Sequence, residues 1–110
     1  MSPRVLTDFE LMVLLAITRV GDDAYGVPIA REIKTTAGRH VMLGAVYTAL
    51  ERLERRGLVA SHLGDPTPER GGRAKRYFHL TPKGLRAVKE MHRALSALWA
   101  NVPELKGQTL

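Results

Sequence analysis

The residues of this sequence best suited to chemistry are cations, and they fall into two groups. The first follows a helical pattern and consists of Arg52, Arg55 and Arg56. The second lies within seven residues that contain no acid and consists of Arg70, Arg73, Lys75 and Arg76. Guanidinium and ammonium groups bind phosphate, and a guanidinium also recognises guanine. The two groups therefore indicate a surface for a polyanion.

Each group also has an interpretation that involves no ligand. The helical arginines can form a solvated face with Glu51 and Glu54, because opposite charges at this spacing are common on exposed helices. The second group can protect an edge strand, because cations discourage pairing with another chain. The second group follows the helical one in chain order, and the glycine pair at 71–72 leaves its loop mobile. Both features favour contact with a phosphate backbone.

Other kinds of chemistry have little support in the residue types. The chain of 110 residues has no cysteine, which excludes disulfides, thiolate zinc sites and cysteine nucleophiles. The glycine pair lacks the Lys-Ser or Lys-Thr sequel of a phosphate-binding loop. No recurring metal-ligand spacing is found among the four histidines, which are His40, His62, His79 and His92. We therefore predict no enzyme activity, no metal site and no cofactor.

The net charge of +6 is unevenly distributed along the chain. Residues 1–38 carry four basic and five acidic side chains, whereas residues 39–93 carry twelve and five. A localised positive field favours a polyanionic partner, although net charge also serves solubility. The longest apolar run, 11–17, has seven residues, far below the ~20 that span a bilayer. Acids rather than a basic segment precede it, so we expect no membrane partner and a cytoplasmic location.

Three helices precede the second cationic group. A Thr-x-x-Glu capping box opens the first, over about 7–20. Proline in the first turn predicts the second over about 26–37. The third begins at Gly44 and stops at Gly57. Its outward positions include Thr48 and Arg52, and Arg52 is able to reach guanine or phosphate.

A hairpin and a long helix complete the chain. Alternation predicts strands over 58–63 and 74–80 around a turn-rich loop, and a Thr-Pro pair opens a helix from 82 to about 101. The order of elements predicts a mainly α fold with a small β-hairpin, a winged helix-turn-helix over 1–81. In such a module the third helix enters the major groove and the loop meets the backbone. Residues 82–110 are expected to form a dimerisation helix and a frayed tail.

Two apolar surfaces exceed what one small core can bury. The first helix carries a second apolar face made of Leu11, Leu14 and Leu15. The last helix carries a heptad seam made of Leu85, Val88, His92, Leu95, Trp99 and Val102. We predict that these surfaces pack against each other between two subunits, with His92 setting the register.

Trp99 is the only tryptophan, and its place in the seam has two interpretations. It is an anchor of the dimer interface, or it lines a pocket for a small aromatic effector. The first is the simpler of the two.

Several blocks of residues, taken in order, resemble the PadR-type transcriptional regulators. They are Leu-Thr-Asp-Phe-Glu at 6–10, Tyr-Gly-Val-Pro-Ile at 25–29, Gly-Ala-Val-Tyr-Thr-Ala-Leu-Glu-Arg-Leu-Glu at 44–54 leading to Gly-Leu-Val at 57–59, and Gly-Arg-Ala-Lys-Arg-Tyr-Phe-His-Leu-Thr-Pro-Lys-Gly at 72–84. The resemblance implies a homodimeric repressor that binds an inverted-repeat DNA operator and is often released by a small molecule. It also implies that Tyr47 touches the DNA backbone, that Arg73 and Lys75 make the loop-strand contact, and that Tyr25 supports the second helix.

The sequence departs from this family at Ala45, where similar proteins often have Ser or Thr. The departure removes a possible phosphate contact, although a small first turn of Gly44 and Ala45 allows close approach to bases or phosphates. An alternative stays open, a winged-helix protein-interaction module without direct DNA binding. RNA is a weaker partner, because Tyr77 and Phe78 fall on opposite faces and form no stacking platform.

Overall fold

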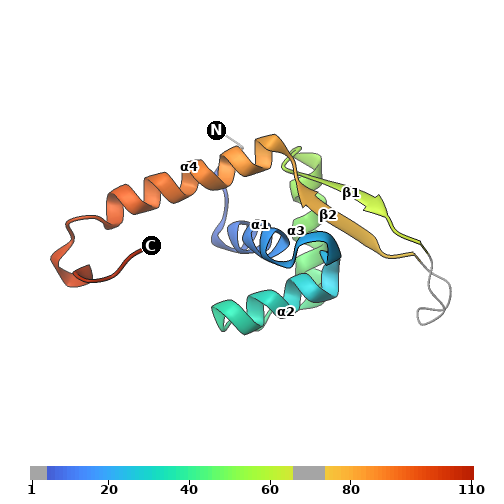
Figure 1. The fold of residues 1–110 in the computed structure, drawn as a ribbon, viewed down its shortest axis with the longest axis horizontal. Coiled ribbons are helices and arrows are strands. Elements are labelled where there is room, and N and C mark those ends of the chain that lie inside the picture. Colours follow the sequence, from blue (N-terminus) through green and yellow to red (C-terminus); the bar gives the residue numbers. More distant parts are fainter. Residues whose placement is uncertain (1–4, 66–73) are drawn as a thin grey trace.

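Over the residues that the structure describes, the fold consists of four α-helices and a two-stranded antiparallel hairpin (Figure 1). A computed structural model describes residues 5–65 and 74–110. The elements are α1 (Asp8–Val20), η1 (Gly21–Asp23), α2 (Gly26–Ala37), α3 (Leu43–Arg55), β1 (Val59–Leu63), β2 (Arg76–Leu80), α4 (Pro82–Trp99) and η3 (Pro103–Leu105). The predicted class, mainly α with a winged hairpin, is confirmed.

Helices α1, α2 and α3 pack around one apolar core that also receives the hairpin. Its largest fully buried side chains are Val13, Leu14, Ile29, Val46, Leu50, Leu53 and Val59. The start of α1 is fixed by the predicted capping box. Thr7 Oγ1 accepts from the Glu10 amide at 3.0 Å, and Glu10 Oε1 accepts from the Thr7 amide at 2.9 Å.

The hairpin is joined to the helices through one edge and one face. Its register runs from Val59 opposite Leu80 to Leu63 opposite Arg76, so the strands are shorter than predicted. Phe78 is buried against the core, and its amide donates to the Ala24 carbonyl at 2.8 Å. The segment just before α2 is therefore hydrogen-bonded to the free edge of β2.

The first turn of α4 is attached tightly to the turn between α3 and β1. Thr81 caps the helix, and its hydroxyl donates to the Gly57 carbonyl at 2.6 Å. A Cβ on Gly84 would lie only 1.9 Å from the Leu58 carbonyl oxygen. Glycine is therefore required here by close backbone contact.

Beyond its first turns, α4 extends away from the three-helix body (Figure 1). The radius of gyration is 15.7 Å, larger than the roughly 13 Å of a compact chain of this length. The helix ends at Trp99 and not near Asn101 as predicted, because Ala100 is extended and Asn101 has a positive φ of 64°. Val102 consequently lies outside the helix and does not continue the heptad seam.

The last residues do not extend straight beyond α4 but turn back beneath it (Figure 1). After η3 the chain reaches His92, whose Nε2 lies 3.4 Å from the Leu110 carbonyl oxygen. The expectation that residues 106–110 fray therefore gives way to a tail placed against α4.

Candidate nucleic-acid interface

Helix α3 has one buried face and one exposed face. Val46, Ala49, Leu50 and Leu53 are buried in the core. The exposed face contains all five residues predicted to contact DNA from this helix, which are Gly44, Ala45, Tyr47, Thr48 and Arg52. The helix therefore presents a small first turn followed by a tyrosine, a hydroxyl and a cation.

The start of α3 has no side-chain cap. Met42 is the N-cap residue, and the amides of Ala45 and Val46 both donate to its carbonyl, at 3.0 and 3.2 Å. Thr48 donates its hydroxyl to the Gly44 carbonyl at 3.0 Å. This leaves the lone pairs of the Thr48 oxygen facing outward as acceptors.

The three arginines of the first cationic group have different surroundings. Arg55 pairs with Glu51 at 3.6 Å on the exposed surface, as the solvated-face interpretation expects. Arg56 pairs at 3.3 Å with Glu10, which is buried, and so helps to hold α1 against α3. Within the described residues Arg52 is exposed and has no ion pair, so it is the one of these three arginines most available to a ligand.

Two neighbouring cations, Lys75 just before β2 and Arg76 at its start, point to opposite faces of the hairpin, because successive residues of an extended chain alternate. Lys75 Nζ lies 4.6 Å from the centre of the Tyr25 ring, and that ring meets Tyr77 edge-on at 5.6 Å. Arg76 instead donates to Ser61 Oγ at 3.0 Å. The predicted cluster is thus divided in two, and its remaining members, Arg70 and Arg73, lie outside the described residues.

Ser61 links the hairpin to α3, a role that the sequence did not indicate. It accepts from Arg76 and donates to Glu54 Oε2 at 2.7 Å. These residues come from three elements: the cross-strand register brings Arg76 near Ser61, and the packing of β1 beside α3 brings Ser61 near Glu54. The chain Arg76, Ser61, Glu54 fixes the hairpin relative to the exposed face of α3.

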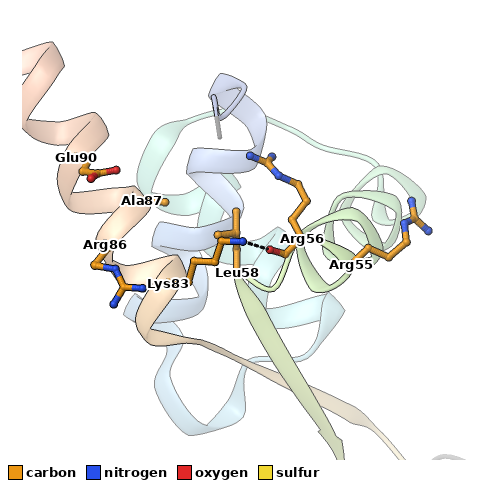
Figure 2. A pocket seen from close by; sticks show the side chains of 7 residues that line it. All are labelled: Arg55, Arg56, Leu58, Lys83, Arg86, Ala87 and Glu90. Atoms are coloured by element: carbon orange, nitrogen blue, oxygen red, sulfur yellow. Dashed lines mark hydrogen bonds between the residues drawn. The ribbon is translucent and has the colours of Figure 1, made fainter. Parts of the chain in front are cut away.

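A further set of cations, the junction pocket, lies where α3 ends and α4 begins (Figure 2). This pocket is lined by Arg55, Arg56, Leu58, Lys83, Arg86, Ala87 and Glu90. Figure 2 shows the side chains of Arg55 and Arg56 pointing in different directions, and Lys83 donates to the Arg56 carbonyl at 3.0 Å. The charges do not converge on one point, and the bond from Lys83 joins the start of α4 to the end of α3.

An apolar groove lies between α1 and α4. It is lined by Leu11, Leu15, Val88, Lys89, His92, Arg93, Leu95, Ser96 and Leu110. The prediction that Leu14 belongs to the same surface is wrong, because its side chain is fully buried in the core of its own chain. Leu14 lies four residues after Glu10 and three before Ile17, both buried, so it shares their helix face.

Two seam residues lie outside this groove. Leu85 is exposed on the first turns of α4 and does not line it. Trp99 is half-buried and lines a separate pocket together with residues 100–103 and 105–108. Its indole nitrogen is buried and has no hydrogen-bond partner in the described part of the chain.

Two further properties bear on the kind of site. In residues 5–65 and 74–110 no group of three or more His, Cys, Asp or Glu side chains could hold a metal ion. Among the helices of those ranges, none combines the length and apolarity needed to cross a membrane.

Comparison with known proteins agrees with this geometry. The model of the transcriptional regulator PadR-like family matches residues 13–90, which is more than half of the chain and includes α2, α3 and the hairpin. The chain belongs to this family. The resemblance inferred from the sequence is confirmed, and with it a PadR-like regulator that binds DNA and is not an enzyme.

Solved structures of PadR-like proteins share the fold. A PadR-like transcription factor from Bacteroides fragilis is 25% identical, with a TM-score of 0.68 and 82% of each chain covered. A PadR family regulator from Eggerthella lenta is 25% identical, with a TM-score of 0.67, covering 87% of this chain and 81% of that one. A PadR-like regulator from Bacillus cereus is 23% identical, with a TM-score of 0.71, covering 91% and 93%. No curated protein matches the sequence.

Proposed function

We propose that this PadR-like regulator is a homodimeric repressor that binds an inverted-repeat operator through α3. The observation that carries the proposal is the exposed face of α3, where small residues precede Tyr47, Thr48 and Arg52, which has no ion pair among the described residues. Gly44 and Ala45 allow the backbone to approach bases and phosphates closely, and Arg52 supplies a donor for guanine or phosphate.

The hairpin supplies the second contact in this proposal. Lys75 is held over the Tyr25 ring at the base of the loop, and Arg76 lies on the side of α3. Together with Arg70 and Arg73 they form the backbone-contacting group. The residues from 1 to 81 would thus bind DNA, and 82–110 would serve dimerisation.

Homodimerisation is supported by the exposure of α4. Of its 18 residues only Gly84 is buried, and Leu11, Leu15, Val88, His92 and Leu95 line an apolar groove beside it. A second copy related by twofold symmetry would cover the groove and place two α3 helices about 34 Å apart, one duplex turn. The cytoplasm is the proposed compartment.

A small aromatic effector is the least constrained part of the proposal. Trp99 supports it through its half-buried ring and its buried indole nitrogen, which has no hydrogen-bond partner among the described residues; the alternative is that Trp99 anchors the dimer interface. Quenching of Trp99 fluorescence by planar aromatic compounds that also lower DNA affinity would support an effector site.

The test of DNA binding is a gel-shift titration with duplex and single-stranded probes over a range of salt concentrations. We expect binding to duplex that weakens steeply with salt. Arg52→Ala should weaken it at least about tenfold, the loss typical of one base or phosphate contact. Arg86→Ala removes the same charge from the junction pocket between α3 and α4 and should weaken duplex binding much less.

The alternative of a protein-interaction module makes the opposite prediction. If the wild-type chain binds duplex no better than it binds single strands, and Arg52→Ala behaves like Arg86→Ala, then α3 does not read DNA and the proposal is wrong.

A further inference from the structure

The start of α2 and the exposed face of α3 meet at a single close contact. A Cβ built on Gly26 would lie 2.5 Å from Tyr47 Cζ, 2.6 Å from its hydroxyl oxygen and 2.7 Å from Cε1. All three distances are shorter than any real Cβ contact, so the outer half of the phenol ring rests directly on the glycine. No larger residue fits at position 26 while the ring stays where it is.

The backbone gives no other reason for glycine at this position. Gly26 is the first residue of α2, is buried, and is not among the glycines with positive φ. An alanine adopts this conformation easily and is a better helix former than glycine. The space occupied by Tyr47 is therefore what excludes a side chain.

We propose that Gly26 is a positioning residue for Tyr47. The glycine holds the phenol against the start of α2 and so sets where its hydroxyl lies on the DNA-contacting face of α3. This inference rests on the proposed function, because the positioned hydroxyl is taken to donate to a backbone phosphate. The contact also couples the orientation of α2 to the surface that α3 presents.

The contact governs position more than stability. Tyr47 is 47% exposed, so a methyl group at position 26 would push its ring into solvent and leave the core intact. Gly84 offers the contrast, because a Cβ there would meet the Leu58 backbone, which cannot move aside. A substitution at Gly26 should therefore alter DNA affinity while the melting temperature changes little.

The experiment is a double-mutant cycle with Gly26→Ala, Tyr47→Ala and the double variant. Affinity is measured for a random-sequence duplex at low salt, because a backbone contact does not depend on base sequence. We expect Gly26→Ala to weaken binding about tenfold in the wild-type background and less than about twofold in the Tyr47→Ala background. Tyr47→Phe should weaken binding by a similar factor, because it removes the hydroxyl alone.

Two controls separate positioning from a structural defect. Gly84→Ala should lower both melting temperature and affinity, and its effect should persist in the Tyr47→Ala background. In NMR spectra of the free protein, Tyr47→Ala should shift the Gly26 α-protons, because the ring that shields them is gone.

The possible outcomes distinguish this inference from the proposed function. Wild-type protein that fails to bind duplex overturns both. Wild-type protein that binds, with equal losses from Gly26→Ala in both backgrounds or no Gly26 shift in Tyr47→Ala, overturns the positioning role alone. A loss of affinity from Gly26→Ala that occurs only when Tyr47 is present, together with the shift of the Gly26 α-protons in Tyr47→Ala, supports the positioning role.

Discussion

At the scale of single residues, the hairpin depends on one serine. Ser61 accepts from Arg76 and donates to Glu54, so its hydroxyl oxygen completes a path from β2 through β1 to α3. All three side chains are close to solvent, which limits the contribution of each bond to stability. The larger consequence is geometric, because without the serine Arg76 is free to leave the side of α3.

Ser61→Ala should therefore lower the free energy of unfolding by only about 0.5–1.5 kcal/mol, the ordinary value for such bonds. It should also weaken duplex binding, because the hairpin is less firmly oriented. Chemical denaturation and gel-shift titration measure the two effects. Ser61→Thr keeps the hydroxyl and serves as the control; equal loss in both variants would contradict the role of the bond.

Glu32 gives the stability a dependence on pH. The Thr36 hydroxyl and the Arg19 guanidinium, 2.6 Å away, hold the pKa of Glu32 below its ordinary value of 4.5. A carboxylate with a lowered folded pKa stabilises the protein above the unfolded pKa, and the stabilisation is lost as pH falls through the folded one.

Glu32→Gln should accordingly lower the melting temperature slightly at neutral pH and have no effect at acidic pH well below 4.5. Thermal melts recorded across this range measure the difference. Glu104→Gln, in η3, is the control, because this carboxylate has no ion pair among the described residues, and it should change the melting temperature at neutral pH less than Glu32→Gln does. A difference for Glu32→Gln that persists in acid would show that the charge of Glu32 is not its cause.

At the scale of elements, the direction of α4 is set by its first turn. The Thr81 cap bonds to Gly57, and Gly84 lies against the Leu58 carbonyl, so the start of α4 is fixed to the end of α3. Ala87, Val88 and Met91 then pack against the core, so a change in the first-turn contact alters where the apolar side of α4 points.

Gly84→Ala should destabilise the protein by about 2–3 kcal/mol, because a methyl group cannot fit beside the backbone oxygen. Urea unfolding measures the loss. Gly44→Ala is the matched control, since nothing lies within 4 Å of its Cβ position, and it should be neutral or stabilising. Similar behaviour of the two variants would mean that the contact at Gly84 is easily relieved.

At the scale of the whole molecule, the apolar groove between α1 and α4 is open in the single chain. Leu15 is 43% exposed and Leu95 36% exposed, on facing sides of the groove. A second copy is the proposed occupant, and its helices would remove these side chains from water.

Leu95→Glu should convert a dimer at micromolar concentration into a monomer, because a carboxylate would have to lose its hydrating water within an apolar interface. Light scattering or sedimentation measures the change. Leu98→Glu is the control, since Leu98 is 75% exposed on the same helix and does not line the groove. A wild-type monomer, or dissociation by Leu98→Glu alone, would contradict this interface.

The sequence by itself determined the elements and their order. The capping box of Thr7 and Glu10, the stop at Gly57 and the Thr81-Pro82 start all act through bonds between near neighbours, so local chemistry specifies them. The same holds for the outward face of α3, because helical periodicity separates it from Val46 and Leu50. The predicted fold and the α3 part of the site followed from these signals.

Only the tertiary structure decided which of several similar residues serve each surface. Leu14 is buried in the core, whereas Leu11 and Leu15 line the groove, because the packing of α1 against α2 and α3 determines which of its sides is buried. Arg76 reaches Ser61 through the cross-strand register, and Lys75 reaches Tyr25 because the segment before α2 is hydrogen-bonded to the free edge of β2. The contact of Gly26 with Tyr47 joins residues that are distant along the chain. Such contacts arise through space between separate elements, and no local pattern encodes them.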